Sequence, residues 1–226
     1  MKIAKKAIKE AKLILAAERV FSEVGFKNAK MESIAAEAGI TKVTLYAYFK
    51  SKENLYLAVT HKALQLLTDS YLDIRQKNKN KSGLESCLEL IKAFMDFCEQ
   101  NYLYSEVLLD YYTLIRSSNK GKDLAKMSDG IADSAYFSKI QTIQNEPFKI
   151  LASEIDRGQR DGSITCRIDP MLFTIFAWTN SIGYIKVVSA AGDITTPLMK
   201  INFDQLKSLG IQIATDLLTS DKAYII

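Results

Sequence analysis

Residues 31–55, MESIAAEAGITKVTLYAYFKSKENL, constrain the fold most, because apolar residues recur there at helical spacing on both sides of a single glycine. The first set follows the i, i+3, i+4, i+7 pattern of one helix face: Met31, Ile34, Ala35 and Ala38. Gly39 can adopt the left-handed conformation that ends such a helix. The stretch therefore begins with a short helix followed by a tight turn.

A second short helix is predicted directly after the turn. Thr41 can cap its N-terminus, and Leu45 and Phe49 lie four residues apart, so both can point into a core. The other positions form an outward face: Lys42, Val43, Thr44, Ala47 and Tyr48. Ser51 can cap a third helix, with Lys52 beside its positive end. This arrangement is typical of a helix-turn-helix, which fits the major groove of DNA.

Residues 14–55 resemble the DNA-binding region of the TetR-like family of bacterial regulators. The matching pieces are Ile14-Leu15-Ala16-Ala17, Phe21, Gly25-Phe26, Ile34-Ala35, Ala38-Gly39-Ile40, Thr44-Leu45-Tyr46, Tyr48-Phe49 and Ser51-Lys52-Glu53. So many fixed spacings are far more specific than one short motif. The chain departs from the family at Ala29 and Lys30, where Thr or Ser is usual, and at Val43, where Gly is frequent. These departures affect a helix cap and the operator sequence rather than the assignment.

The resemblance implies an all-α protein with an N-terminal three-helix DNA-binding domain, residues 1–55, and a larger helical ligand-binding and dimerisation domain, residues 56–226. The positions that match DNA-facing positions of the family are Thr41, Lys42, Val43, Thr44, Tyr46, Tyr48 and Lys52. Lys42 can reach a guanine edge or a phosphate, and Val43 can meet a thymine methyl group. The hydroxyl groups of Thr44, Tyr46 and Tyr48 are expected to contact phosphates. Lys52 and Lys30 are expected to add two further phosphate contacts.

Composition agrees with this organisation. The chain has only 10 glycines and 3 prolines, and no alternating β-pattern recurs, so helices are expected throughout. Residues 1–56 contain 11 Lys and Arg against 6 Asp and Glu, whereas residues 57–226 contain 19 against 20. The basic excess therefore lies with the helix-turn-helix, as phosphate binding requires. The alternative is a lysine-rich segment that only aids solubility.

The sequence offers little support for catalysis, a metal site or a cofactor. The only histidine is His61, which leaves a hydrolytic triad without a second candidate base, and no glycine-rich phosphate loop occurs. The three cysteines are too scattered for a disulfide framework or a metal site, and we expect buried thiols: Cys87, Cys98 and Cys166. Charged residues interrupt any signal-peptide core, and the longest apolar stretch, residues 171–185, is short for a membrane span. A cytoplasmic protein that is not an enzyme is expected.

The remaining helices follow from apolar spacing and from the residues that break it. They are expected at residues 8–24, 51–76, 84–100, 103–116, 130–160, 170–189 and 203–219, with loops at 77–83 and 119–129. Pro147 should start or kink a helix within the fifth of these ranges. The string Arg157-Gly158-Gln159-Arg160-Asp161-Gly162-Ser163-Ile164, followed by Asp169-Pro170, also resembles the family segment before its last two helices.

Aromatic residues are plentiful in the second part of the chain. The resemblance implies a ligand pocket between the helices of residues 84–160, and the candidate lining residues are Phe94, Phe97, Tyr104, Tyr111, Tyr112, Phe137 and Trp178. The alternative is that these side chains only fill the core. A hydrophobic or aromatic ligand is expected, although carboxylates on the same helices also allow a cationic one: Asp96, Glu99, Glu106 and Asp110.

Together these features predict a sequence-specific DNA-binding transcription regulator, a repressor released from a palindromic operator by a small hydrophobic or aromatic effector. A homodimer is expected through residues 170–189 and 203–219, because the first range is apolar nearly all round. Two alternatives belong to other classes. One is a helical ligand-binding protein that has lost specific DNA binding, and the other is an enzyme built on the C-terminal helices.

Overall fold

A computed structural model describes residues 2–117, 131, 134–190 and 202–223. The chain forms two compact units that interleave in sequence: a first unit of Met1–Gln65 and Tyr102–Gln144, and a second unit of Leu66–Asn101 and Asn145–Ile226. Within the described ranges there is no β-strand, apart from one isolated bridge between Arg167 and Ala223. The expected all-α fold class is confirmed.

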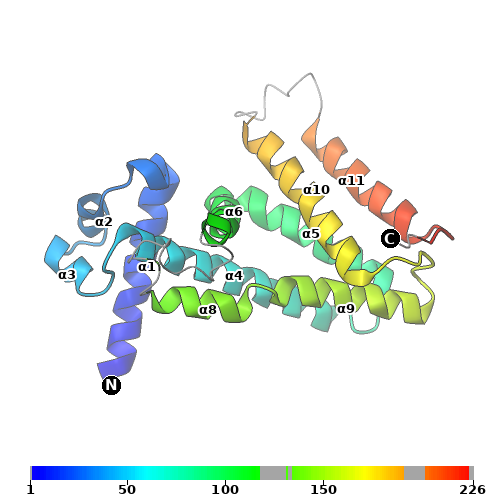
Figure 1. The fold of residues 1–226 in the computed structure, drawn as a ribbon, viewed down its shortest axis with the longest axis horizontal. Helices are drawn as coiled ribbons and strands as arrows, with labels where there is room; N and C mark the ends of the chain where they lie inside the picture. The colour runs from blue at the N-terminus through cyan, green and yellow to red at the C-terminus, as the bar shows by residue number, and fades with distance from the viewer. Residues whose placement is uncertain (1, 118–130, 132–133, 191–201, 224–226) are drawn as a thin grey trace. The chain divides into compact units, whose positions relative to one another are not determined.

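The first unit contains the predicted helix-turn-helix (Figure 1). Its helices are α1 (Lys2–Asn28), α2 (Met31–Glu37), α3 (Lys42–Tyr46), the first part of α4 (Lys52–Lys77), α6 (Tyr102–Ser117) and α8 (Ala135–Ile143). Helix α1 begins before the predicted residue 8. Gly25, with φ 72° and ψ 161°, interrupts it where the sequence predicted its end.

A small apolar core holds α1, α2 and α3 together. The largest contributions come from fully buried side chains of these helices and of the turn after α3: Leu13, Phe21, Ile34, Leu45 and Phe49. The predicted inward positions, Leu45 and Phe49, are 0% and 1% exposed. Gly39 has φ 66°, so the glycine turn also forms as the sequence indicated.

Helices α6 and α8 pack with the N-terminal helices through tyrosine–carboxylate hydrogen bonds. The Tyr104 hydroxyl of α6 donates to Glu18 of α1 at 3.0 Å, and the Tyr136 hydroxyl of α8 donates to Glu10 at 2.7 Å. The first compact unit thus extends beyond residue 55, where the division between functional domains was predicted. That division stays a prediction.

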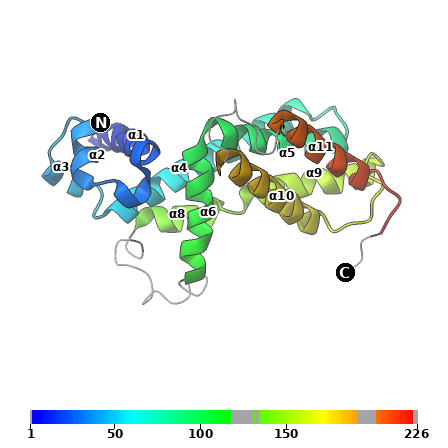
Figure 2. The ribbon, with the colours of Figure 1, turned by 90° about the horizontal axis from the view of Figure 1, so that it is seen from above.

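The second unit is a helical bundle made of the rest of α4 together with α5 (Gly83–Gln100), α9 (Glu146–Asp161), α10 (Pro170–Ala190) and α11 (Phe203–Leu218). Helices α10 and α11 both pack on α5 and on each other (Figure 2). The single helix expected at 130–160 is divided into α8 and α9, with Pro147 in the first turn of α9. The loop expected at 119–129 lies outside the described residues.

The crossing of α5 and α9 explains the glycine-containing string after residue 156. A Cβ atom on Gly83 would lie 2.1 Å from the backbone nitrogen of Gly158, so the two backbones are in direct contact. The Gly83 amide donates to the Asp161 carboxylate at 2.8 Å, and the Leu84 amide donates to the Ser163 hydroxyl at 3.1 Å. The end of α9 therefore caps the start of α5, which satisfies backbone donors that a helix leaves open.

Gly83→Ala should destabilise the protein strongly, because the new methyl group forces the backbones of α5 and α9 apart. We expect a loss of at least about 2 kcal/mol in the free energy of unfolding, measured by urea denaturation. Gly183→Ala is the matched control: its Cβ would meet no atom within 4 Å. In a helix that change should be neutral or stabilising by about 0.5 kcal/mol. Equal stability of the two variants would contradict the close-contact explanation.

Candidate nucleic-acid interface and apolar cavity

The N-terminus of helix α3 is capped, and two buried side chains hold the helix against the core: Leu45 within it and Phe49 in the turn that follows. The Thr41 hydroxyl oxygen accepts from the Thr44 amide at 3.2 Å and lies 2.9 Å from the Thr44 hydroxyl oxygen, which confirms the predicted cap. With Leu45 buried, Val43 and Tyr46 project outward and are 81% and 41% exposed. The helix therefore offers a short, exposed face of mixed apolar, hydroxyl and aromatic chemistry.

Lys42, at the first position of α3, pairs with Glu32 of α2 and lies 5.7 Å from the ring centroid of Tyr46. A hydrogen bond from Lys42 lowers the pKa of Glu32, and the same hydrogen bond raises the pKa of Lys42. Sequence reasoning missed Glu32, because nothing in the local spacing brings residue 32 to residue 42. The turn at Gly39 places them side by side and puts a carboxylate on the candidate interface.

Two further residues predicted to contact DNA, Lys30 and Tyr48, differ in their exposure. Lys30 is exposed and precedes α2, whose N-terminus has no side-chain cap, in keeping with the departure from the family at this position. Tyr48 is half-buried, and the ammonium of Lys9 lies 5.7 Å from its ring centroid. Both residues belong to the same three-helix region as α3.

Lys52, for which a phosphate contact was predicted, is bonded within the protein, and the phosphate contact stays a prediction. Its ammonium donates to three backbone carbonyl oxygens of the protein: Phe26 at 2.7 Å, Lys27 at 3.2 Å and Ala29 at 2.9 Å. Ser51 caps α4 as predicted, by accepting from the Asn54 amide at 3.1 Å. The sequence thus placed Lys52 correctly at the start of α4, but it gave no sign of these partners, which come from residues more than twenty positions earlier.

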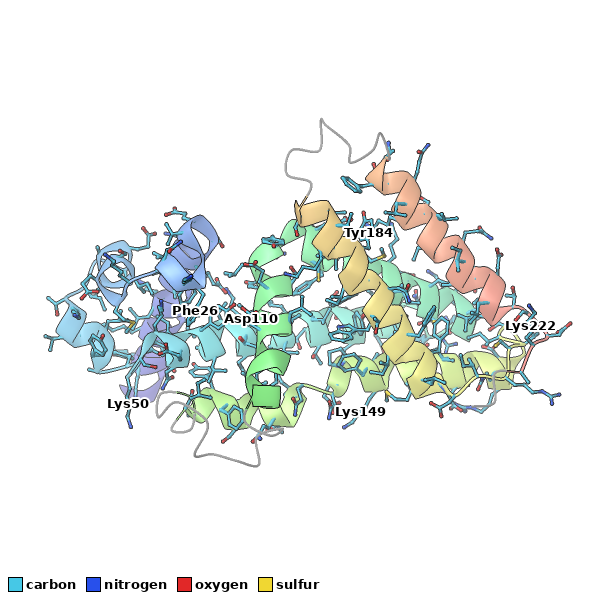
Figure 3. The ribbon with its side chains drawn as sticks, turned by 45° about the horizontal axis from the view of Figure 1, so that its top comes forward. Phe26, Lys50, Asp110, Lys149, Tyr184 and Lys222 are labelled. Carbon is cyan, nitrogen blue, oxygen red and sulfur yellow. The ribbon has the colours of Figure 1, made fainter. Side chains whose placement is uncertain are left out.

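The first unit also contains polar contacts between α4 and α6. The Tyr56 hydroxyl of α4 donates to Asp110 of α6 at 2.7 Å, and Asp110 is labelled in Figure 3. Lys62 of α4 donates at 2.7 Å to Glu18, the carboxylate that also accepts from Tyr104. Burial raises the pKa of Tyr56 and Tyr104, so both hydroxyls stay protonated and donate at neutral pH.

An apolar cavity of about 340 Å³ lies in the second unit between α5, α10 and α11. Its wall is mainly aliphatic and phenylalanine side chains, including Ile91, Met95, Phe173, Phe176, Leu206 and Ile213. Asn180, Ser181 and Tyr184 add polar groups. The Tyr184 hydroxyl donates to Glu99 of α5 at 2.6 Å, and Tyr184 is labelled on α10 in Figure 3. This size and lining are typical of a small-molecule site.

None of the seven aromatic residues expected to line a ligand pocket lines this cavity. They are divided between the compact units: Tyr104, Tyr111, Tyr112 and Phe137 belong to the first, and Phe94, Phe97 and Trp178 to the second. The side chain of Tyr112 lies outside the described residues. Trp178 contacts Phe148 edge to face, with ring centroids 5.7 Å apart. A pocket lined by these aromatics stays a prediction.

Other reactive groups in the described part of the chain point to structural roles. No cluster of three or more His, Cys, Asp or Glu there could hold a metal ion. All three cysteines are buried, and burial raises the pKa of Cys98 to about 12. His61 lies 5.6 Å from the Tyr136 ring centroid, and burial lowers its pKa.

Helix α10 carries more apolar surface than the second unit covers. Residues Pro170–Ser189 are long and apolar enough to cross a membrane, which the sequence did not predict, and only 33% of that window is buried. Several of its large apolar side chains are exposed: Met171, Leu172, Ile175, Phe176 and Val187. On α11, Leu209 and Ile213 are also exposed, at 53% and 51%. One such helix is weak evidence that the protein binds a membrane. An exposed apolar surface of this kind usually marks a site of interaction with another molecule.

Residues 13–59 match the family model described as bacterial regulatory proteins, tetR family. Among curated proteins, the chain is 35% identical over 94 residues to the transcriptional activator FasR of Mycolicibacterium smegmatis, covering 41% of this chain and 42% of FasR. It is 41% identical over 122 residues to the transcriptional regulator RutR of Escherichia coli O157:H7, covering 54% of this chain and 57% of RutR. These alignments span about half the length of the relatives.

Solved structures extend the likeness to nearly the whole chain. The FadR regulator of Bacillus subtilis, solved in complex with stearoyl-CoA, has a TM-score of 0.63, covers 92% of this chain and is itself covered to 98%. Its sequence identity is 17%, so this likeness shows the fold alone. The fold therefore pairs an N-terminal helix-turn-helix with a larger C-terminal helical region, as predicted.

Proposed function

Because the chain belongs to the TetR family of bacterial regulatory proteins, we propose that it is a sequence-specific DNA-binding transcription regulator. The exposed face of α3 carries the proposal, since a capped helix with two buried anchors fits a major groove. Lys42 and Val43 contact base edges, and Thr44, Tyr46 and Tyr48 contact phosphates. Lys30 adds a phosphate contact, and Thr41 sets the start of the helix. The protein acts in the cytoplasm, as a repressor.

Selection of bound duplexes from a random-sequence library tests this function directly. Enrichment of a palindromic sequence supports a dimeric regulator, because two-fold symmetry in the protein requires it in the operator. Binding that depends on salt but not on sequence would favour the alternative, a helical ligand-binding protein that has lost specific recognition. Transcription from a promoter carrying the selected site then separates repression from activation, the activity named for FasR.

Glu32 should weaken DNA binding, because its carboxylate competes with the DNA for the ammonium of Lys42. Glu32→Gln is expected to tighten duplex binding by about twofold to fivefold at low salt, the range of one surface ion pair. The matched control is Glu37→Gln, which removes the same charge from α2 but frees Arg19 of α1, paired at 2.7 Å. Affinities measured by fluorescence anisotropy should differ between the variants. Equal tightening would mean that net charge alone controls affinity.

The surplus apolar surface of α10 and α11 supports a homodimer through residues 170–189 and 203–219. A second copy that packs the same two helices against this surface forms a four-helix bundle, the usual solution for paired amphipathic helices. The exposed phenylalanine Phe176 and the exposed Leu209 and Ile213 lie on these helices. A second protein chain fits this surface better than a membrane does, because α11 is amphipathic and its exposed apolar residues extend the apolar surface of α10.

Phe176→Glu should convert the protein to a monomer, because a carboxylate in an apolar interface is left without a partner. The side chain is 48% exposed within one chain, so the variant should fold. Sedimentation at micromolar concentration measures the change. Leu66→Glu on α4 is the control, since Leu66 is 42% exposed but lies outside the proposed interface and should leave the dimer intact. A monomeric wild-type protein would refute the proposal.

The cavity between α5, α10 and α11 supports a small hydrophobic or aromatic effector. Its wall is largely apolar. The side chains of Ser181, Asn180 and Tyr184 donate within the protein, and their oxygens can accept a hydrogen bond that orients a ligand. The stearoyl-CoA bound to B. subtilis FadR provides an example of an apolar chain as a ligand within the same fold. An effector that prefers a conformation with wrongly spaced recognition helices releases the operator.

A panel of fatty acids and aromatic compounds should contain a ligand that lowers operator affinity over the concentration range in which it binds. Trp178, the only tryptophan, reports binding by fluorescence, because its neighbour Ala177 lines the cavity. Gly210 lines the cavity and a Cβ there meets no atom within 4 Å, so Gly210→Leu should partly fill the cavity and weaken ligand binding. If partner side chains occupy the cavity instead, no compound will bind the dimer.

A further inference from the structure

The end of α1 after Gly25 and the short connection to α2 supply three backbone carbonyl oxygens as acceptors. Gly25 breaks α1 with its positive φ, and the following residues bring the carbonyl oxygens of Phe26, Lys27 and Ala29 around one point. The ammonium of Lys52 occupies that point and bonds to all three. An ammonium has three donor protons, so three carbonyl acceptors use its whole hydrogen-bonding capacity.

An aromatic cluster supports the same ammonium. It lies 4.6 Å from the ring centroid of Phe26, within cation–π range. The Phe26 ring in turn packs at 4.4 Å from Tyr56 of α4 and at 5.8 Å from Phe21 of α1, between centroids. Phe26 is labelled in Figure 3. The surroundings of the Lys52 ammonium therefore come from α1, from the α1–α2 connection and from α4 itself.

We propose that Lys52 is a positioning residue of the DNA-binding unit, and that it does not contact phosphate. Lys52 is the first residue of α4, directly after the turn that follows α3, so its bonds tie the exit of α3 to the entry of α2. These two connections determine how α3 packs against α2. The proposal rests on the proposed function as a DNA-binding regulator.

Lys52→Met and Lys30→Met remove the same charge and separate positioning from phosphate contact. For Lys52→Met we expect affinity for the selected operator to fall about tenfold, the order of one hydrogen bond to a charged group. Affinity for non-sequence-specific duplex and the salt slope should stay unchanged, because no phosphate contact is lost. Lys30→Met should weaken both kinds of duplex binding and flatten the salt slope by about 0.9. Urea denaturation should show lower stability only for Lys52→Met.

Two further variants complete the test. Phe26→Leu removes the aromatic seat without changing charge and should reproduce the operator-specific loss, which keeps the proposal testable if Lys52→Met does not fold. Lys52→Arg retains a cationic donor and should restore part of the operator affinity. A flatter salt slope with unchanged stability for Lys52→Met would overturn positioning in favour of a phosphate contact. Absence of any preferred sequence for the wild-type protein would instead refute the proposed function, while the stability comparison would still test the carbonyl contacts.

Discussion

A helix of only five residues, such as α3, is not stable by itself, and its conformation depends on the packing of neighbouring elements. Helix formation has a costly first turn, and short helices are marginal in water unless tertiary packing supports them. Helix α3 has little more than one turn of backbone, a hydroxyl cap at Thr41 and one buried side chain, Leu45, and the buried Phe49 lies in the turn that follows. Its outward face is therefore a property of the α1–α4 packing, and contacts far from α3 can alter what it presents.

Local spacing was sufficient to predict this unit in outline. The positions of Gly39, Thr41 and Phe49 follow from helical periodicity and turn chemistry, which act over a few residues. The partners of Lys52 and Lys42 could not be predicted in the same way, because the Phe26 carbonyl and Glu32 reach them only after the chain folds back. Sequence placed these lysines on the correct helices but could not say which charges were already engaged.

The second unit shows the same limit for packing. The string around Gly158 was identified by resemblance, but its role depends on Gly83, seventy-five positions earlier, whose backbone contacts it directly. Likewise, the residues predicted to line a pocket were three phenylalanines, three tyrosines and Trp178, whereas the cavity is bounded mainly by aliphatic side chains and by two other phenylalanines, Phe173 and Phe176. Composition indicates how much apolar surface must be buried, but the pairing of helix faces determines where a cavity remains.

The apolar cavity and the proposed dimer surface share side chains, which has a thermodynamic consequence. Phe176, Leu209 and Ile213 each line the cavity and remain exposed on the face that a second copy would cover. A ligand that moves these side chains changes the surface offered to the partner subunit. By linkage, dimerisation must then change ligand affinity by the same factor. Effector affinity of the unaltered chain, measured below and above the concentration at which it dimerises, would consequently differ, and the difference is the coupling free energy between ligand binding and dimerisation.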